Sequence, residues 1–98
     1  KVEPNKKFKK PSSNEKKALE KLVTRLSEID QSLKPEAIQT IIYSTGKENG
    51  YEKNLREWFK LIYEVVFGEE NGPRMGYFVS FFGLKETIEL MKDKIKNN

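Results

Sequence analysis

The sequence predicts an all-α fold, a compact bundle of about five helices. Apolar residues recur at spacings of three and four through each long segment, which is the period of an amphipathic helix. Glycine, proline and asparagine stand between these segments, where turns are expected. The 98 residues are enough for one small domain with a single core, and no segment requires a sheet.

The first helix is expected over roughly residues 13–30, because Ser12 and Glu15 have the spacing of a capping box. Its buried stripe should consist of Leu19, Leu22, Val23, Leu26 and Ile29. Before it, residues 1–11 are polar, basic and carry two prolines. We interpret residues 1–11 as a basic linker or arm and residues 12–98 as the folded helical domain.

The second helix should begin at Pro35, because a first helical turn does not need the N–H that proline lacks. Its buried stripe should consist of Ile38, Ile41 and Ile42. Thr45-Gly46 should end this helix, and residues 47–53 should form a polar loop.

The third helix should begin after Asn54, a favourable N-cap residue, and stop at Gly68. It carries two neighbouring apolar stripes, so it should lie at the centre of the domain. One stripe is Leu55, Phe59, Ile62 and Val66, and the other is Trp58, Leu61 and Val65. The β-branched and aromatic content would also suit a strand, but the length and the two stripes favour a helix.

Two further helices complete the predicted bundle. Residues 75–82 could form a helix or a strand, and the spacing of Met75, Phe78, Val79 and Phe82 favours a helix. The last helix should run from about residue 84 to residue 95. Its expected buried face is Leu84, Ile88, Met91 and Ile95.

The net charge of +4 resides in the first ten residues, which hold five lysines and one glutamate. This distribution predicts a basic arm rather than a basic domain. The chain has no histidine and no cysteine, which removes the commonest general base, the commonest metal ligand and every cysteine nucleophile. We therefore expect no catalytic residue, no metal site and no cofactor in this chain. No apolar stretch is long enough to span a membrane.

The segment from residue 58 to residue 91 carries a specific pattern. An aromatic helix with Phe59 and Tyr63 leads into a glycine-rich turn, and a second aromatic helix and a final helix follow. The turn is marked by Gly68, Glu70, Gly72, Pro73, Arg74 and Gly76, and Gly83 precedes the final helix. This pattern resembles the C-terminal domain of class I lysyl-tRNA synthetases. The glutamyl-tRNA synthetases are similar in this region but lack the full Gly-Pro-Arg-x-Gly spelling.

The resemblance implies a function. In that family the C-terminal helical domain holds the anticodon arm of transfer RNA, and an N-terminal domain of the same chain binds ATP and carries out the chemistry. The two catalytic motifs of that domain, His-Ile-Gly-His and Lys-Met-Ser-Lys-Ser, are absent here. The resemblance therefore implies a cytoplasmic fragment, beginning at Lys1, that positions lysine tRNA for a catalytic domain it does not include.

Single-stranded RNA loops are recognised by stacking unpaired bases on aromatic rings or guanidinium planes. Tyr77 and Phe81 lie four residues apart and off the expected buried stripe, so they are candidate RNA-binding rings. Tyr51, in the expected polar loop, is a third candidate. The rings expected in the core are Phe59, Phe67, Phe78 and Phe82.

Arg74 is the preferred RNA-binding candidate, because its planar guanidinium suits a phosphate or a base edge. The alternative is a structural arginine that ties the turn to Glu64 or Glu70. The residues expected to shape the turns are Gly68, Gly72, Pro73, Gly76 and Gly83. A second function also stays open, a protein-interaction helical module without RNA binding, which the neutral charge of residues 11–98 would suit.

Overall fold

A computed structural model of the chain describes residues 8–96, and within that range it contains five α-helices and no strand. The helices are α1 (Ser13–Ser27), α2 (Pro35–Gly46), α3 (Leu55–Val66), α4 (Met75–Phe82) and α5 (Leu84–Lys96). A widened helical turn, η1 (Lys47–Tyr51), continues from α2. The predicted all-α bundle is confirmed. Residues 1–7 of the predicted arm, and residues 97–98, lie outside the described range.

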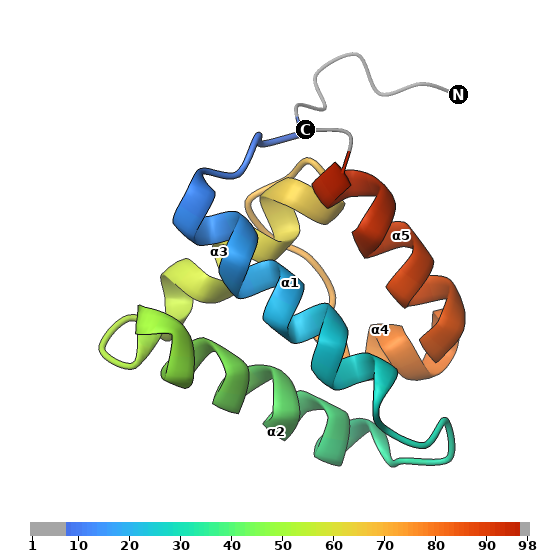
Figure 1. Ribbon diagram of the computed structural model, residues 1–98. Coiled ribbons are helices and arrows are strands. Elements are labelled where there is room, and N and C mark those ends of the chain that lie inside the picture. The colour runs from blue at the N-terminus through green and yellow to red at the C-terminus, as the bar shows by residue number, and fades with distance from the viewer. Residues whose placement is uncertain (1–7, 97–98) are drawn as a thin grey trace.

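The helices are arranged around α1, which crosses the near face of the bundle with α2 on one side and α5 on the other (Figure 1). The short helix α4 packs against α2 and joins directly to α5. Because α4 lies at the edge of the bundle, one of its faces remains available to solvent.

The predicted capping box at the start of α1 is confirmed. The backbone N–H of Glu15 donates to Ser12 Oγ at 3.3 Å, and the N–H of Ser12 donates to Glu15 Oε1 at 2.9 Å. The helix ends at Ser27, earlier than predicted, because the Asp30 carboxylate accepts hydrogen bonds from the backbone and hydroxyl of Ser32. The buried residues of α1 are Ala18, Leu19, Leu22, Val23 and Leu26, while Ile29 lies beyond the helix and is half-buried.

The second helix ends at Gly46 as predicted, but residues 47–51 of the predicted polar loop form the helical turn η1. Gly46 has helical φ and ψ of −62° and −44°, and the chain continues into η1 until Gly50, where φ is +100°. Gly46 lies against Trp58, whose indole leaves no room for a side chain there. The buried side chains of α2 are Ile38, Ile42 and Thr45, and Ile41 is only half-buried.

The third helix supplies much of the core. It begins after Asn54 as predicted, although the Asn54 side chain makes no capping hydrogen bond. Its buried residues are Trp58, Leu61, Ile62, Val65 and Val66. The prediction that Phe59 lies in the core is wrong, because Phe59 is half-buried at the rim, with its ring 5.1 Å from that of Tyr43.

The fourth helix buries a narrower stripe than predicted. Met75, Gly76 and Val79 are buried, whereas Phe82 is 44% exposed and therefore does not belong to the core. Phe82 is the last residue of α4, and its ring stacks on that of Phe78 with the centroids 5.0 Å apart. In α5 the buried residues are Thr87, Met91 and Ile95, and the predicted Leu84 and Ile88 are half-buried.

Candidate nucleic-acid interface

Tyr63 on α3 holds the Gly-Pro-Arg turn in place. Its hydroxyl donates to the carbonyl oxygen of Pro73 at 2.9 Å. A Cβ added to Gly72 would lie 2.7 Å from Cδ1 of the Tyr63 ring, so the turn can lie on the ring only because residue 72 is glycine. Burial raises the pKa of Tyr63, which keeps the hydroxyl protonated as a donor. The tyrosine and the turn therefore form one unit.

Gly76 fixes α4 on α2. Its backbone N–H donates to Gln39 Oε1 at 2.6 Å. A Cβ at this position would overlap the carbonyl oxygen of Pro35 and lie 2.8 Å from the amide nitrogen of Gln39. This close approach sets which face of α4 points toward α2 and which face points to solvent.

Three of the candidate residues lie together on the outer face of α4. Arg74 is the N-cap, and Tyr77 and Phe81 follow it at helical spacing. Phe81 is 92% exposed and Tyr77 is 43% exposed. The Arg74 guanidinium is also exposed, and it forms no ion pair with Glu64, Glu70 or any other carboxylate in residues 8–96. We call Arg74, Tyr77 and Phe81 the α4 face.

A hydrogen bond to α2 orients the Tyr77 ring. The Tyr77 hydroxyl donates to Glu36 Oε2 at 3.0 Å. This bond and the charge of Glu36 raise the pKa of Tyr77. The pKa of Glu36 is lowered, first by a backbone hydrogen bond and then by the bond from Tyr77. Both groups thus keep the charge states that the bond requires near neutral pH.

The fourth candidate, Tyr51, is not brought to the α4 face. It ends η1 and is half-buried, with its ring 5.2 Å from that of Trp58. Burial raises the pKa of its hydroxyl. The contact with the fully buried Trp58 places Tyr51 at the junction of η1 and α3.

The structure also contains a row of aromatic rings that the sequence did not reveal as a unit. Neighbouring ring centroids along the row are 5.0–6.4 Å apart. We call it the aromatic row, and it consists of Tyr43, Phe59, Tyr63, Phe67, Phe78 and Phe82. It runs from α2 across α3 to α4, and every ring in it is at least partly exposed. The sequence does show aromatic residues four apart within residues 59–67 and within residues 78–82. It does not show that the rings of these two helices contact each other.

Glycines end the helices on both sides of this region. Gly68 follows α3 with φ of +73°, and Gly83 separates α4 from α5 with φ of +114°. Both values lie where residues with a Cβ are disfavoured. They allow the chain to leave each aromatic helix sharply, so that α4 stays short.

Within residues 8–96 no group of three potential metal-ligating side chains gathers in one place. In the same range, no helix has both the length and the apolar character needed to cross a membrane.

The chain is similar to known lysine–tRNA ligases. The lysine–tRNA ligase of Rickettsia felis is 41% identical over 85 residues, which make up 87% of this chain and 16% of that ligase. The chain is homologous to part of lysine–tRNA ligases. The enzyme from Rickettsia bellii is 35% identical over 94 residues, which make up 96% of the chain and 18% of the ligase.

The chain thus spans about one-sixth of the length of the curated lysine–tRNA ligases that it matches. No protein-family model and no solved structure matches it. The resemblance to lysyl-tRNA synthetases predicted from residues 58–91 is confirmed at the level of lysine–tRNA ligase homology. The matched region is longer than that segment, since it covers 94 residues.

Proposed function

We propose that the chain is the anticodon-binding domain of a class I lysyl-tRNA synthetase. It would position the anticodon arm of lysine tRNA for an N-terminal catalytic domain of the same protein, where ATP is bound. The homology to lysine–tRNA ligases and the Gly-Pro-Arg-x-Gly turn support this proposal.

The observation that carries the proposal is the exposure of Phe81. A Phe side chain that is 92% exposed forgoes roughly 1.5–3 kcal/mol of burial free energy. It stands beside the half-exposed Tyr77 and beside Arg74, which forms no ion pair within residues 8–96. Exposed rings and a guanidinium are the groups on which unstacked RNA bases are recognised.

The surrounding contacts give the α4 face a fixed geometry. The bond to Glu36 restrains the Tyr77 ring, so little of its freedom remains to be lost on binding. In the proposed complex, bases stack on Phe81 and Tyr77, and Arg74 contacts a phosphate or a base edge. The packing of Gly76 on α2 fixes the orientation of α4, and with it the position of the α4 face beside the Gly-Pro-Arg turn.

The test is a titration of the chain with two RNA hairpins that share a stem. One carries the lysine anticodon loop and the other carries a loop with an altered anticodon. We expect Phe81→Ala to weaken binding to the first hairpin by roughly 5- to 150-fold, the range of one lost base stack, without changing the thermal midpoint. Ser80→Ala, at the exposed neighbouring position, is the matched control and should leave the affinity unchanged.

Equal affinity of the unaltered chain for both hairpins would contradict anticodon recognition. Absence of binding to either would favour the second candidate function, a protein-interaction module. The aromatic row supports that alternative, because it is a partly exposed apolar surface that another domain of the parent protein could cover.

A further inference from the structure

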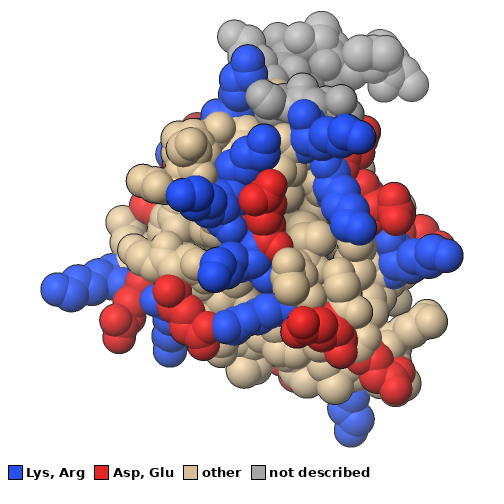
Figure 2. All heavy atoms as spheres, viewed as in Figure 1, with Lys and Arg blue, Asp and Glu red and all other residues tan. Residues whose placement is uncertain are grey.

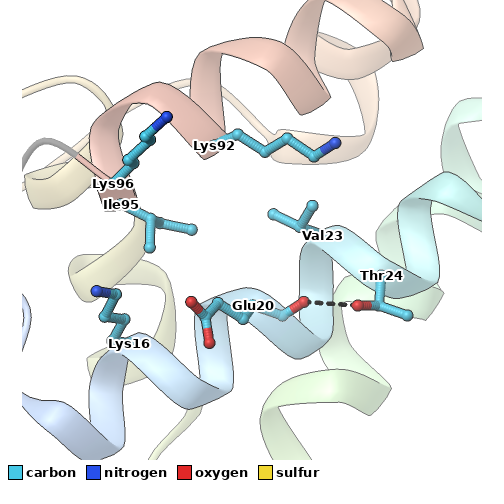
Figure 3. Close-up of a pocket in the computed structure, with 7 residues that line it drawn as sticks. All are labelled: Lys16, Glu20, Val23, Thr24, Lys92, Ile95 and Lys96. Carbon is cyan, nitrogen blue, oxygen red and sulfur yellow. Dashed lines mark hydrogen bonds between the residues drawn. The ribbon is translucent and has the colours of Figure 1, made fainter.

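A second surface, separate from the α4 face, lies between α1 and α5. A hollow of about 430 Å³ opens there, lined by Lys16, Glu20, Val23, Thr24, Lys92, Ile95 and Lys96. Figure 3 shows Val23 and Ile95 approaching each other from the two helices, with the lysines around them. Both apolar side chains are buried, so the hollow has an apolar floor and a charged rim. We call it the α1–α5 groove.

The rim of the groove is mainly basic. Lys16, Lys92 and Lys96 are exposed, and none of them forms an ion pair within residues 8–96. Lys17 and Lys21 continue the basic surface along α1. Figure 2 shows Lys and Arg side chains gathered over α1 and the C-terminal end of α5 on this face, with a few carboxylates among them. The neutral overall charge of residues 11–98 therefore conceals an uneven distribution.

The described start of the chain lies beside the same end of α5. The Lys94 ammonium stands 3.8 Å from the centroid of the Phe8 ring, and Lys9 Nζ lies 3.1 Å from Glu15 Oε2 at the start of α1. Lys6 and Lys7 directly precede Phe8 in the sequence. Phe8 and Lys9 thus lie near the ends of α5 and α1 that border the groove.

We propose that the α1–α5 groove binds the sugar–phosphate backbone of RNA, as a contact independent of base recognition on the α4 face. This inference rests on the proposed tRNA-binding function and adds a second site to it. Flexible lysine ammonium groups suit phosphates as point charges. The apolar floor of Val23 and Ile95 offers a surface for a ribose ring.

Glu20 gives the groove a means of preferring RNA to DNA. In Figure 3 its carboxylate lies beside Lys16 and below Lys92 and Lys96. A carboxylate repels a phosphate but accepts a hydrogen bond from a ribose 2′-hydroxyl, the group that distinguishes RNA from DNA. Phosphates would therefore lie at the lysine rim and a 2′-hydroxyl at Glu20.

The test measures the salt dependence of binding to the same two hairpins. Lys16→Gln with Lys92→Gln should reduce the slope of log affinity against log salt by about 2, because each lost phosphate contact removes about 1. We expect the affinity at low salt to fall on the order of tenfold for both hairpins, with the preference for the lysine anticodon kept. The control pair is Lys47→Gln with Lys53→Gln, which removes the same charge from exposed positions in and near η1 and should leave the slope unchanged.

A DNA hairpin of the same sequence tests the role of Glu20. Glu20→Ala should bring the affinities for RNA and DNA closer together, and an unchanged ratio would overturn that role. An equal loss of slope in the two lysine pairs would overturn the groove as a site, because total charge would then explain binding.

The outcomes separate the two proposals. Anticodon preference with no effect of Lys16 and Lys92 would refute the groove alone. A reduced slope without anticodon preference would refute anticodon recognition alone. Absence of binding to any of the hairpins would refute both.

Discussion

Trp58 is the residue at which α2, η1 and α3 meet. It is fully buried, and its indole Nε1 donates to the carbonyl oxygen of Ile42 at 2.9 Å. Gly46 lies against one part of the ring system and Tyr51 against another. This single side chain therefore fixes how α2 passes through η1 into α3.

We expect Trp58→Ala to destabilise the fold by roughly 3–5 kcal/mol, because it leaves a large cavity and removes the hydrogen bond to the Ile42 carbonyl. Phe59→Ala, one position along, should cost clearly less, since that ring is half-buried. Urea denaturation of both variants measures the difference. A larger loss for Phe59 than for Trp58 would contradict the placement of α3.

Gly76 holds α4 close to the backbone of α2. Gly76→Ala should destabilise the domain by about 1–3 kcal/mol, because the added methyl group overlaps the backbone of Pro35 and forces α4 away. Ser80→Ala, one helical turn later and exposed, should be neutral or slightly stabilising, since alanine favours helices. Thermal melts compare the two, and an unchanged midpoint for Gly76→Ala would mean that α4 is not held against α2 in this way.

The Glu15 carboxylate at the start of α1 should make the stability of the fold depend on pH. Burial alone would raise the pKa of Glu15, but hydrogen bonds from the Ser12 backbone and from Lys9, together with the Lys9 charge, lower it below 4.5. A lowered folded-state pKa means that this carboxylate stabilises the fold above its unfolded-state pKa. That contribution is lost as the pH falls through the folded-state pKa.

We therefore expect the thermal midpoint of the unaltered chain to fall between about pH 5 and pH 3. The midpoint of Glu15→Gln should fall less over the same range, because that variant has no carboxylate to protonate. Ser12→Ala should cost about 1 kcal/mol near neutral pH through loss of the cap. Parallel pH profiles for the unaltered chain and Glu15→Gln would show that the capping box contributes no linked stability.

The elements were predictable because each helix carries its own apolar period and its own boundary residues. Their ends were less so. The Asp30–Ser32 turn stops α1 early, and the chain after Gly46 continues into the helical turn η1 where a loop was predicted. Periodicity shows which side of a helix is apolar, but not how far its partner extends. That is why four rings were predicted in the core although all of them are at least partly exposed: Phe59, Phe67, Phe78 and Phe82.

The whole molecule presents two surfaces of different chemistry. The residues of the α4 face are neighbours in sequence, so spacing within one helix was enough to select Arg74, Tyr77 and Phe81. The α1–α5 groove joins Lys16 to Lys92 and Lys96 from the other end of the chain. No local pattern shows that those lysines meet, so the groove could be found only from the packing of α1 on α5.

Amide chemical-shift mapping of the 98-residue chain with the lysine anticodon hairpin tests the proposed recognition most directly. The largest shifts are predicted at residues 74–82, with a second, salt-sensitive set in the α1–α5 groove and little change in η1. Saturable binding whose shifts avoid α4 and appear elsewhere would contradict anticodon recognition by the α4 face.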